Sequence, residues 1–391
     1  MSGDAAKAGS GWRVPLAEVA VDDELAEAAL QAVRSGWWSM GPRVAEFERA
    51  FADFCGARSA VAVASGTAAL HVALLAVGCG PGDEVIVPSL NFVAAANAIV
   101  HTGAEPVFCD IAGPHELNLD PDDVERAVTP RTKAVVALHY GGFPCAMDAV
   151  AELAARRGLA VVEDAAHAPG ATWRGRACGT LGLAGCFSFF ANKNLPVGEG
   201  GMVVTDDAEV AARLRLLRSH GMTTVTWDRH RGHASSYDVV SAGFNYRLDE
   251  VRAAVGLVQL RRLPEENSRR ARVVARYREA LDGRHGLELP FGHLGAERTP
   301  AHHLAVVLLP EGTDREQVRS TLAERRIQTS VHYPPIHTFT WYRSRATRPL
   351  PRTDVVADRL LTLPLYGRMA RDQVELVIET LSGAVVQAGG H

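Results

Sequence analysis

The sequence lacks the features of several large protein classes. No segment reaches the roughly 20 apolar residues that a membrane-spanning helix needs, and the N-terminal MSGDAAKAGSGW holds no apolar stretch of signal-peptide length. The formal net charge is -4, which argues against a nucleic-acid-binding surface because such surfaces are strongly basic. We therefore expect a cytoplasmic protein that binds neither membrane nor nucleic acid.

Metal-binding patterns are missing as well. The six cysteines form no C-x-x-C pair and show no zinc-ligand spacing, which is typical of reduced thiols in a core. His332 and His337 are separated by Pro334 and Pro335, which prevent a common helical face, and no further ligand lies at a helpful spacing. We therefore predict no metal site.

Short apolar runs alternate with amphipathic segments over about the first 260 of the 391 residues. This alternation predicts an α/β fold with a parallel sheet, and continuous β-branched runs are typical of strands buried on both faces. Val44, Phe47, Phe51 and Phe54 share one face of an expected helix. The expected strands are SAVAVAS, DEVIVPS, EPVFCD, KAVVALH, LAVVEDA, CFSFF and GMVVTD.

The pattern changes after the expected helix at 249–263. A long basic helix at 269–281 leads into a second set of elements, with a strand in HHLAVVLLP and a final helix near 372–381. We therefore predict a large domain at 1–263 and a smaller α+β domain at 264–391.

Two segments rich in small residues are candidates for binding phosphate. The glycine-rich 78–82 (GCGPG) follows an expected helix and precedes a strand, the reverse of a dinucleotide fingerprint, so we interpret it as a turn. Ser65, Gly66 and Thr67 stand where a strand ends and a helix begins. The free N–H groups of a helix start and the Thr67 hydroxyl would suit a phosphate; alternatively, Ser65 or Thr67 simply caps the helix.

Asp164 and Lys193 follow two of the buried strands. A carboxylate at a strand end needs a cationic or hydrogen-bonding partner, such as a protonated pyridine nitrogen, and His167 would lie against the same ligand. The alternative is that Asp164 caps the next turn and His167 is partly exposed.

Lys193 follows the next buried strand. A lysine beside an apolar strand can have a lowered pKa and can condense with an aldehyde; the alternative is a solvated surface residue. Ser188 offers a further hydroxyl. Together these features favour pyridoxal 5'-phosphate as the common ligand.

Several ordered motifs resemble the DegT/StrS family of sugar aminotransferases, which are fold type I pyridoxal-phosphate enzymes. They are SGTAALH, PSLNFVAAANAI, the segment from Asp164 to His167, Phe187 through Lys193 to Gly201, GFNYRLDEVRAA and VHYPPIH. They cover nearly the whole chain. The resemblance implies a mostly parallel seven-stranded sheet between helices in the large domain.

The resemblance also implies roles for single residues. Lys193 would form a Schiff base with the cofactor and shuttle a proton, and Asp164 would keep the pyridine nitrogen protonated. Phe92 would stack on the ring and His167 would lie beside it. The cofactor phosphate would be held by Gly66, Thr67 and Ser188, and by Asn245 of a neighbouring subunit. The expected assembly is a homodimer with shared active sites.

On the substrate side the resemblance points to Trp38, Tyr333 and His337. The basic loop WDRHRGH (Trp227 to His233) is either a contact for a diphosphate or partner subunit, or a solvated loop. The expected reaction moves an amino group from glutamate or glutamine to a keto sugar, such as one linked to a nucleoside diphosphate. The alternatives are a keto cyclitol or another non-nucleotide ketone as substrate, and a non-catalytic cofactor-binding regulator on the same fold.

Overall fold

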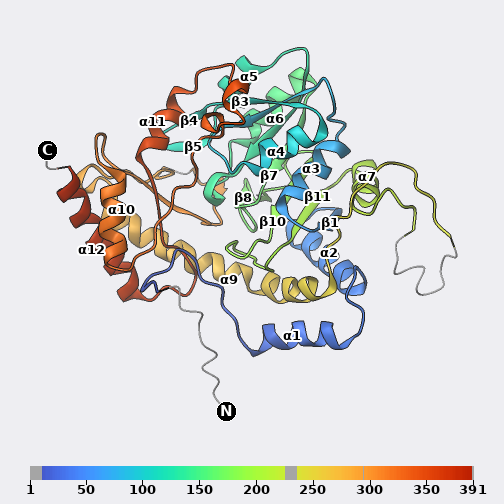
Figure 1. Cartoon of the computed structure of the whole chain (residues 1–391), viewed down its shortest axis with the longest axis horizontal. Coiled ribbons are helices and arrows are strands. Elements are labelled where there is room, and N and C mark those ends of the chain that lie inside the picture. The colour runs from blue at the N-terminus through green and yellow to red at the C-terminus, as the bar shows by residue number, and fades with distance from the viewer. Residues whose placement is uncertain (1–10, 225–235, 294, 390–391) are drawn as a thin grey trace.

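A seven-stranded sheet forms the centre of the computed structural model, which describes residues 11–224, 236–293 and 295–389 (Figure 1). The strand order is β1-β11-β10-β7-β6-β2-β3, and β11 runs antiparallel to its neighbours while the other pairs from β10 to β3 are parallel. The sheet therefore contains all seven strands that the sequence predicts. They are β1 (Ser59–Val63), β2 (Glu84–Pro88), β3 (Glu105–Cys109), β6 (Thr132–Leu138), β7 (Ala160–Asp164), β10 (Ala184–Ser188) and β11 (Gly201–Thr205).

Helices cover both faces of this sheet because its side chains are apolar on both sides. In β1, Val61 and Val63 pack with helices α3 (Gly66–Ala76), α4 (Ala94–Thr102) and α7 (Ala208–Arg218). Ala60 and Ala62 pack on the opposite face with α2 (Pro42–Cys55) and with α9 (Glu250–Leu281). Helices α5 (Pro121–Ala127) and α6 (Met147–Arg157) cover this second face beside them. Helix α1 (Asp23–Arg34) precedes α2 in the chain.

One long helix, α9 (Glu250–Leu281), replaces the two helices that the sequence predicts on either side of residue 263. Pro264 lies inside it and removes one backbone donor. The helix continues because both halves are held by burial: Leu263 packs against the sheet layer and Tyr277 against a second core. The expectation of two separate helices was wrong, and the division into domains at 263 stays a prediction.

The second core lies beside the C-terminal half of α9, where α10 and α12 pack against each other (Figure 1). It also includes Val14 from the N-terminal segment and the strand pair β13–β14. Its elements are β13 (Ala305–Leu308), α10 (Arg315–Glu324), α11 (Pro351–Arg359), β14 (Leu360–Leu363) and α12 (Arg371–Ala388). Small additional elements are β4 (Ile111–Gly113), β5 (Glu116–Leu119), β8 (Thr172–Trp173), β9 (Arg176–Ala177), β12 (Arg298–Thr299) and the 3-10 turns η1 (Tyr140–Gly142), η2 (Arg284–Gly286), η3 (Ile336–Thr338) and η4 (Arg343–Arg345).

Several smaller predictions can be compared with these elements. The glycine-rich 78–82 is a turn between α3 and β2, as predicted, and both Gly78 and Gly82 have positive φ. All six cysteines are buried and free, as expected for core residues. Among the described helices, none is both long and apolar enough to span a membrane. The loop from Trp227 to His233 lies outside the described residues.

Candidate active site

A cavity of about 370 Å³, partly open to solvent, lies at one edge of the sheet. The carboxyl ends of β7 and β10 and the first residues of α3 form part of its wall, which is where open parallel sheets place their ligands. The sheet thus brings together most of the residues that the sequence analysis selects. Those that line the cavity are Gly66, Thr67, Phe92, Asp164, His167, Ser188, Lys193 and Tyr333.

The start of α3 packs tightly against the end of β10. Ser65 caps the helix, since its hydroxyl accepts the N–H of Ala68 at 3.1 Å, so the capping alternative holds for this residue. A Cβ atom on Gly66 would lie 2.7 Å from Cβ of Ser188. Only glycine therefore lets the helix start approach the serine. The close approach leaves the hydroxyls of Thr67 and Ser188 beside the first N–H groups of the helix, an arrangement suited to an oxyanion.

The carboxylate of Asp164 is buried at the end of β7. Asn91 donates its side-chain N–H to one oxygen at 3.3 Å, and the N–H of Ala166 donates to the other at 3.2 Å. Asp164 therefore does cap the following turn. Burial nevertheless raises the pKa of Asp164, with the two hydrogen bonds opposing. No cationic side chain in the described part of the chain bonds to this carboxylate, so a cationic ligand nitrogen would fit it.

His167 is buried and not partly exposed as one interpretation of the sequence held. The N–H of Gly141 donates to Nδ1 of His167 at 3.3 Å, so this nitrogen carries no proton. Burial lowers the pKa of His167 well below its ordinary value, and the proton of the neutral ring is therefore on Nε2. Nε2–H then donates to the hydroxyl oxygen of Tyr333, 3.0 Å away. The hydroxyl proton of Tyr333 remains available to a group in the cavity.

Lys193 lies in the loop of residues 189–200, which joins the neighbouring strands β10 and β11. The strand before it is shorter than predicted: β10 ends at Ser188, and Phe190 is 44% exposed because the chain has already turned into the loop. Burial lowers the pKa of Lys193 from 10.5 to about 8, while the charge of Asp164 raises it. Within the described residues, the Lys193 amine makes no hydrogen bond or ion pair. It is a candidate nucleophile and not a solvated surface cation.

The histidines near Lys193 are neutral. Burial is the main cause that lowers the pKa of His303, and it lowers that of His332 to about 4. The positive charge of Lys193 lowers both further. His332 bonds to Thr362 and His303 to Asn194 through their Nδ1 atoms, both at 3.0 Å. Asp164 is the carboxylate whose charge acts on the lysine amine.

One residue of the cavity wall differs from its interpretation in the sequence, and two others were not selected from the sequence. Phe92 is 54% exposed and its ring centroid lies 5.6 Å from that of Tyr333, so it is not a core residue. Asn91, which the sequence analysis did not select, holds Asp164 in place. Asn192 also lines the cavity, and its buried Oδ1 has no hydrogen-bond partner. Both asparagines are polar residues that follow a buried strand, the same signal that marks Asp164.

Three predicted site residues do not line this cavity. Trp38 is 62% exposed and donates its indole N–H to the carbonyl of Val33 at 3.0 Å, so it lies on the surface after α1. Asn245 is exposed, in a backbone bridge with Ser219. His337 lies outside the cavity lining and bonds to Ser89 and Asp354. The substrate roles of Trp38 and His337, and the role of Asn245 in the site of a neighbouring subunit, therefore stay predictions.

His337 joins Ser89 and Asp354 in a clamp, which we call the Ser89 clamp. Its Nδ1 lies 2.7 Å from Oγ of Ser89, and its Nε2 lies 3.0 Å from Oδ1 of Asp354. These are the residue types of a hydrolase triad. However, Ser89 is fully buried and its oxygen also accepts the backbone N–H of His337 at 3.1 Å. The clamp therefore fixes η3 to the end of β2 and has no nucleophile that a substrate can reach.

Comparison with known proteins identifies the family. The DegT/DnrJ/EryC1/StrS aminotransferase family matches residues 19–382. The chain belongs to this family. The spore coat polysaccharide biosynthesis protein SpsC of Bacillus subtilis (strain 168) is 45% identical over 363 residues, which cover 91% of this chain and 92% of SpsC.

Two solved structures also match over nearly the whole chain. DesV of S. venezuelae, solved in complex with a ketimine intermediate, is 40% identical with a TM-score of 0.84, covering 93% of this chain and 94% of DesV. The sugar aminotransferase CalS13 of Micromonospora echinospora is 32% identical with a TM-score of 0.87, covering 95% and 99%.

As a member of the DegT/DnrJ/EryC1/StrS family, the protein is a pyridoxal-phosphate-dependent aminotransferase. The non-catalytic alternative is thereby set aside. The cavity fits such a cofactor in three respects: a buried carboxylate without a cationic partner, a lysine amine without a bonded partner, and a helix start that only Gly66 can bring against Ser188.

Proposed function

We propose that this aminotransferase transfers an amino group from glutamate or glutamine to a keto sugar, in particular one linked to a nucleoside diphosphate. The observation that carries the proposal is the single cavity that Lys193 and Asp164 both line. The sugar part is supported by the relatives: SpsC acts in polysaccharide biosynthesis and CalS13 is a sugar aminotransferase.

Lys193 and Asp164 have the catalytic roles in this proposal. Pyridoxal phosphate, when bound, supplies an aldehyde and a ring that spreads negative charge. The Lys193 amine would hold the cofactor covalently between turnovers. Once free, it would act as the base that takes a proton from the carbon bearing the donor's amino group, and as the acid that returns it. The lowered pKa of Lys193 keeps part of the amine neutral for this task. Asp164 binds the ring nitrogen and favours its protonated form.

The remaining cavity residues position the ligands. Gly66, Thr67 and Ser188 would hold the cofactor phosphate, as their convergence at the start of α3 supports. Phe92 would stack on the ring, since its exposed face lines the same cavity. His167 would orient Tyr333, whose hydroxyl proton then serves as a donor to an oxygen of the substrate.

A homodimer in the cytoplasm completes the proposal. Asn245 and Trp38 are exposed and lie outside the cavity of their own chain, so they contact a ligand only if a second chain places them there. The free, buried cysteines agree with a reducing compartment.

The substrate can be tested with the protein in its pyridoxamine phosphate form. Keto sugar nucleotides and keto cyclitols are added separately, and both the amino product, by mass spectrometry, and the returning visible absorption band are recorded. We expect both signals with a keto sugar nucleotide and neither with Lys193→Ala. A response confined to cyclitols would replace the proposed substrate, and no response to either class would refute it.

Shared sites can be tested by mixing two inactive variants, Lys193→Ala and Asn245→Ala. In a heterodimer one site has both substitutions and the other has neither. An equal mixture should therefore recover about one quarter of the wild-type activity once the subunits exchange. No recovery by proteins that do exchange subunits would rule out Asn245 as a partner contribution.

A further inference from the structure

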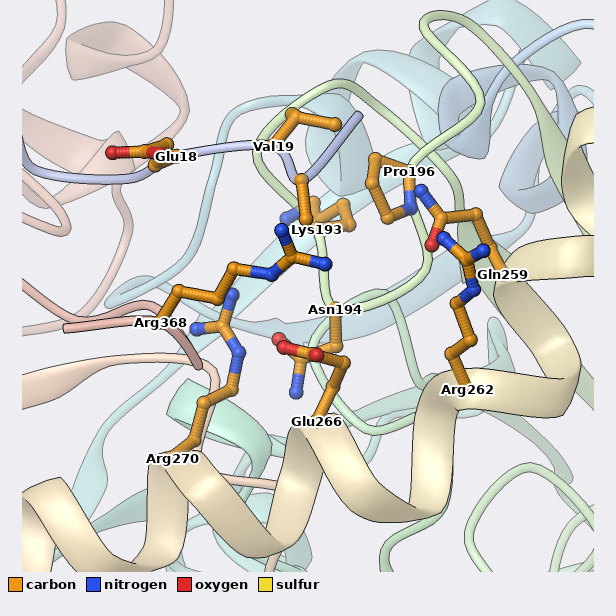
Figure 2. A pocket seen from close by; sticks show the side chains of 11 residues that line it. Glu18, Val19, Lys193, Asn194, Pro196, Gln259, Arg262, Glu266, Arg270 and Arg368 are labelled. Atoms are coloured by element: carbon orange, nitrogen blue, oxygen red, sulfur yellow. The ribbon is translucent and has the colours of Figure 1, made fainter. Parts of the chain in front are cut away.

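A second, much smaller cavity, partly open to solvent, has Lys193 in its wall as well (Figure 2). Its other walls come from residues 18–20 of the N-terminal segment, from α9, and from the segment that precedes α12, which carries Arg368. Lys193 is the residue that its lining has in common with that of the cofactor cavity. The function proposed above does not use this second cavity.

Arg270 is the most deeply placed cation of this second cavity, with 5% of its surface exposed. One of its five N–H groups donates to the carbonyl of Leu365 at 3.0 Å. Burial lowers the pKa of Arg270 to about 10, so the guanidinium stays charged at neutral pH. Glu266 is a nearby carboxylate, but it is paired with Arg269 at 3.0 Å. Burying a guanidinium group costs free energy unless an anion bonds to it. Within the described residues, Arg270 bonds to a carbonyl and to no carboxylate, so an anion bound beside it would offset this cost.

Two further arginines border the same cavity. Arg262 is paired with Asp22 and Glu24, yet its Nη1 is buried and has no hydrogen-bond partner. Arg368 is exposed, and it makes no hydrogen bond or ion pair with the residues that the structure describes. Figure 2 shows the guanidinium groups of Arg270 and Arg368 directed into the same space between the Lys193 loop and α9. The carboxylate of Glu266 points toward this space as well but is also paired with Arg269, so the two guanidinium charges are only partly balanced.

We propose that the second cavity is a binding site for a small oxyanion, a carboxylate or a phosphate group, held between Arg270 and Arg368. The planar guanidinium fork matches both groups and bonds to them through paired N–H donors. The carboxylates of Glu18 and Glu266 at the wall restrict the site to a small ligand. The site is separate from the one formed by Gly66, Thr67 and Ser188, which we call the phosphate cradle at Gly66. The phosphate cradle belongs to the cofactor cavity.

An anion in this cavity would also affect Lys193. A negative charge beside the lysine favours its protonated form, which is the less reactive one. Anion binding should therefore raise the pH at which the lysine nitrogen of the holoenzyme titrates. The charged and titratable groups around Lys193 that set this balance are Asp164, His167, His303 and His332 on the cofactor side, and Glu18, Glu266, Arg262, Arg270 and Arg368 on the side of the second cavity.

The test is calorimetric titration of the holoenzyme at low ionic strength, with inorganic phosphate and with malonate as probes. In the holoenzyme the phosphate cradle at Gly66 is already filled. We expect saturable binding of at least one probe, weakened at least about 10-fold in Arg368→Gln, which removes a charge-assisted hydrogen bond. The matched control is Arg371→Gln, an exposed arginine at the start of α12 that does not line this cavity.

Each outcome decides the proposal. Saturable binding that Arg368→Gln weakens and Arg371→Gln does not supports the site, and the stronger probe identifies phosphate or carboxylate as its ligand. Binding of equal strength in all three proteins, or no saturable binding, overturns it. Because the titration needs no turnover, an inactive enzyme that still binds the probe refutes the proposed function and leaves this site in place.

Discussion

The amine of Lys193 should react as a free base at a pH where ordinary lysines are protonated. Burial lowers its pKa from 10.5 to about 8, and the carboxylate of Asp164 keeps it from falling further. At pH 7 a pKa of about 8 leaves roughly one amine in ten neutral, which is about 300-fold more than for an ordinary lysine. The neutral fraction rises with pH, so the rate of cofactor attachment should rise and level off above about pH 8.

The measurement is the rate at which the cofactor-free protein develops the visible absorption band after mixing with pyridoxal phosphate, recorded from pH 6 to 10. The chain has three lysines, and Lys133→Arg is the matched control because Lys133 is exposed. This control should keep the profile, whereas Lys193→Arg should give no band. Asp164→Asn should move the midpoint to lower pH, since it removes the charge that favours the ammonium form. A midpoint near pH 10 would refute the reasoning from burial.

Three further substitutions test single contacts. Asp164→Asn should lower kcat roughly 100-fold or more while the visible band is retained, since a preorganised charge is lost; near wild-type kcat would contradict its role. Gly66→Ala should weaken cofactor binding by at least about 10-fold in an equilibrium titration, because its Cβ would overlap Ser188 and overpacking costs about 1–3 kcal/mol. Ser89→Ala should lower the free energy of urea unfolding by about 1–3 kcal/mol, since His337 loses a buried partner. An unchanged free energy would show that the Ser89 clamp has no structural role.

Much of the sheet could be predicted because its signal is local. Each of the seven strands is a short apolar run, buried on both faces, and needs no distant residue to be recognised. The position of the candidate active site could be predicted in the same way, from the residues at the strand ends. Asp164 and Ser188 are the last residues of two neighbouring parallel strands, so their side chains line the same cavity at this edge of the sheet.

What could not be predicted depends on contacts between distant segments. Pro264 suggested a break in α9, but packing on two cores keeps the helix intact. His337 stands in a motif that suggested substrate contact, but its partners are Ser89 and Asp354. The second cavity joins the N-terminal segment, α9 and the segment before α12, and no local pattern places Arg270 beside Arg368.

The loop that carries Lys193 begins and ends in the same sheet. Phe189 N–H donates to the carbonyl of Gly200, and Val197 N–H donates to that of Phe189, so the loop is fixed at both ends by β10 and β11. An inserted or deleted residue would shift the register of one strand or move the amine out of reach of Asp164. Changes of side chain at Asn192, by contrast, leave the backbone in place. The length of the loop is therefore constrained more strictly than the residue type at Asn192, so the cavity wall can vary there while Lys193 keeps its position.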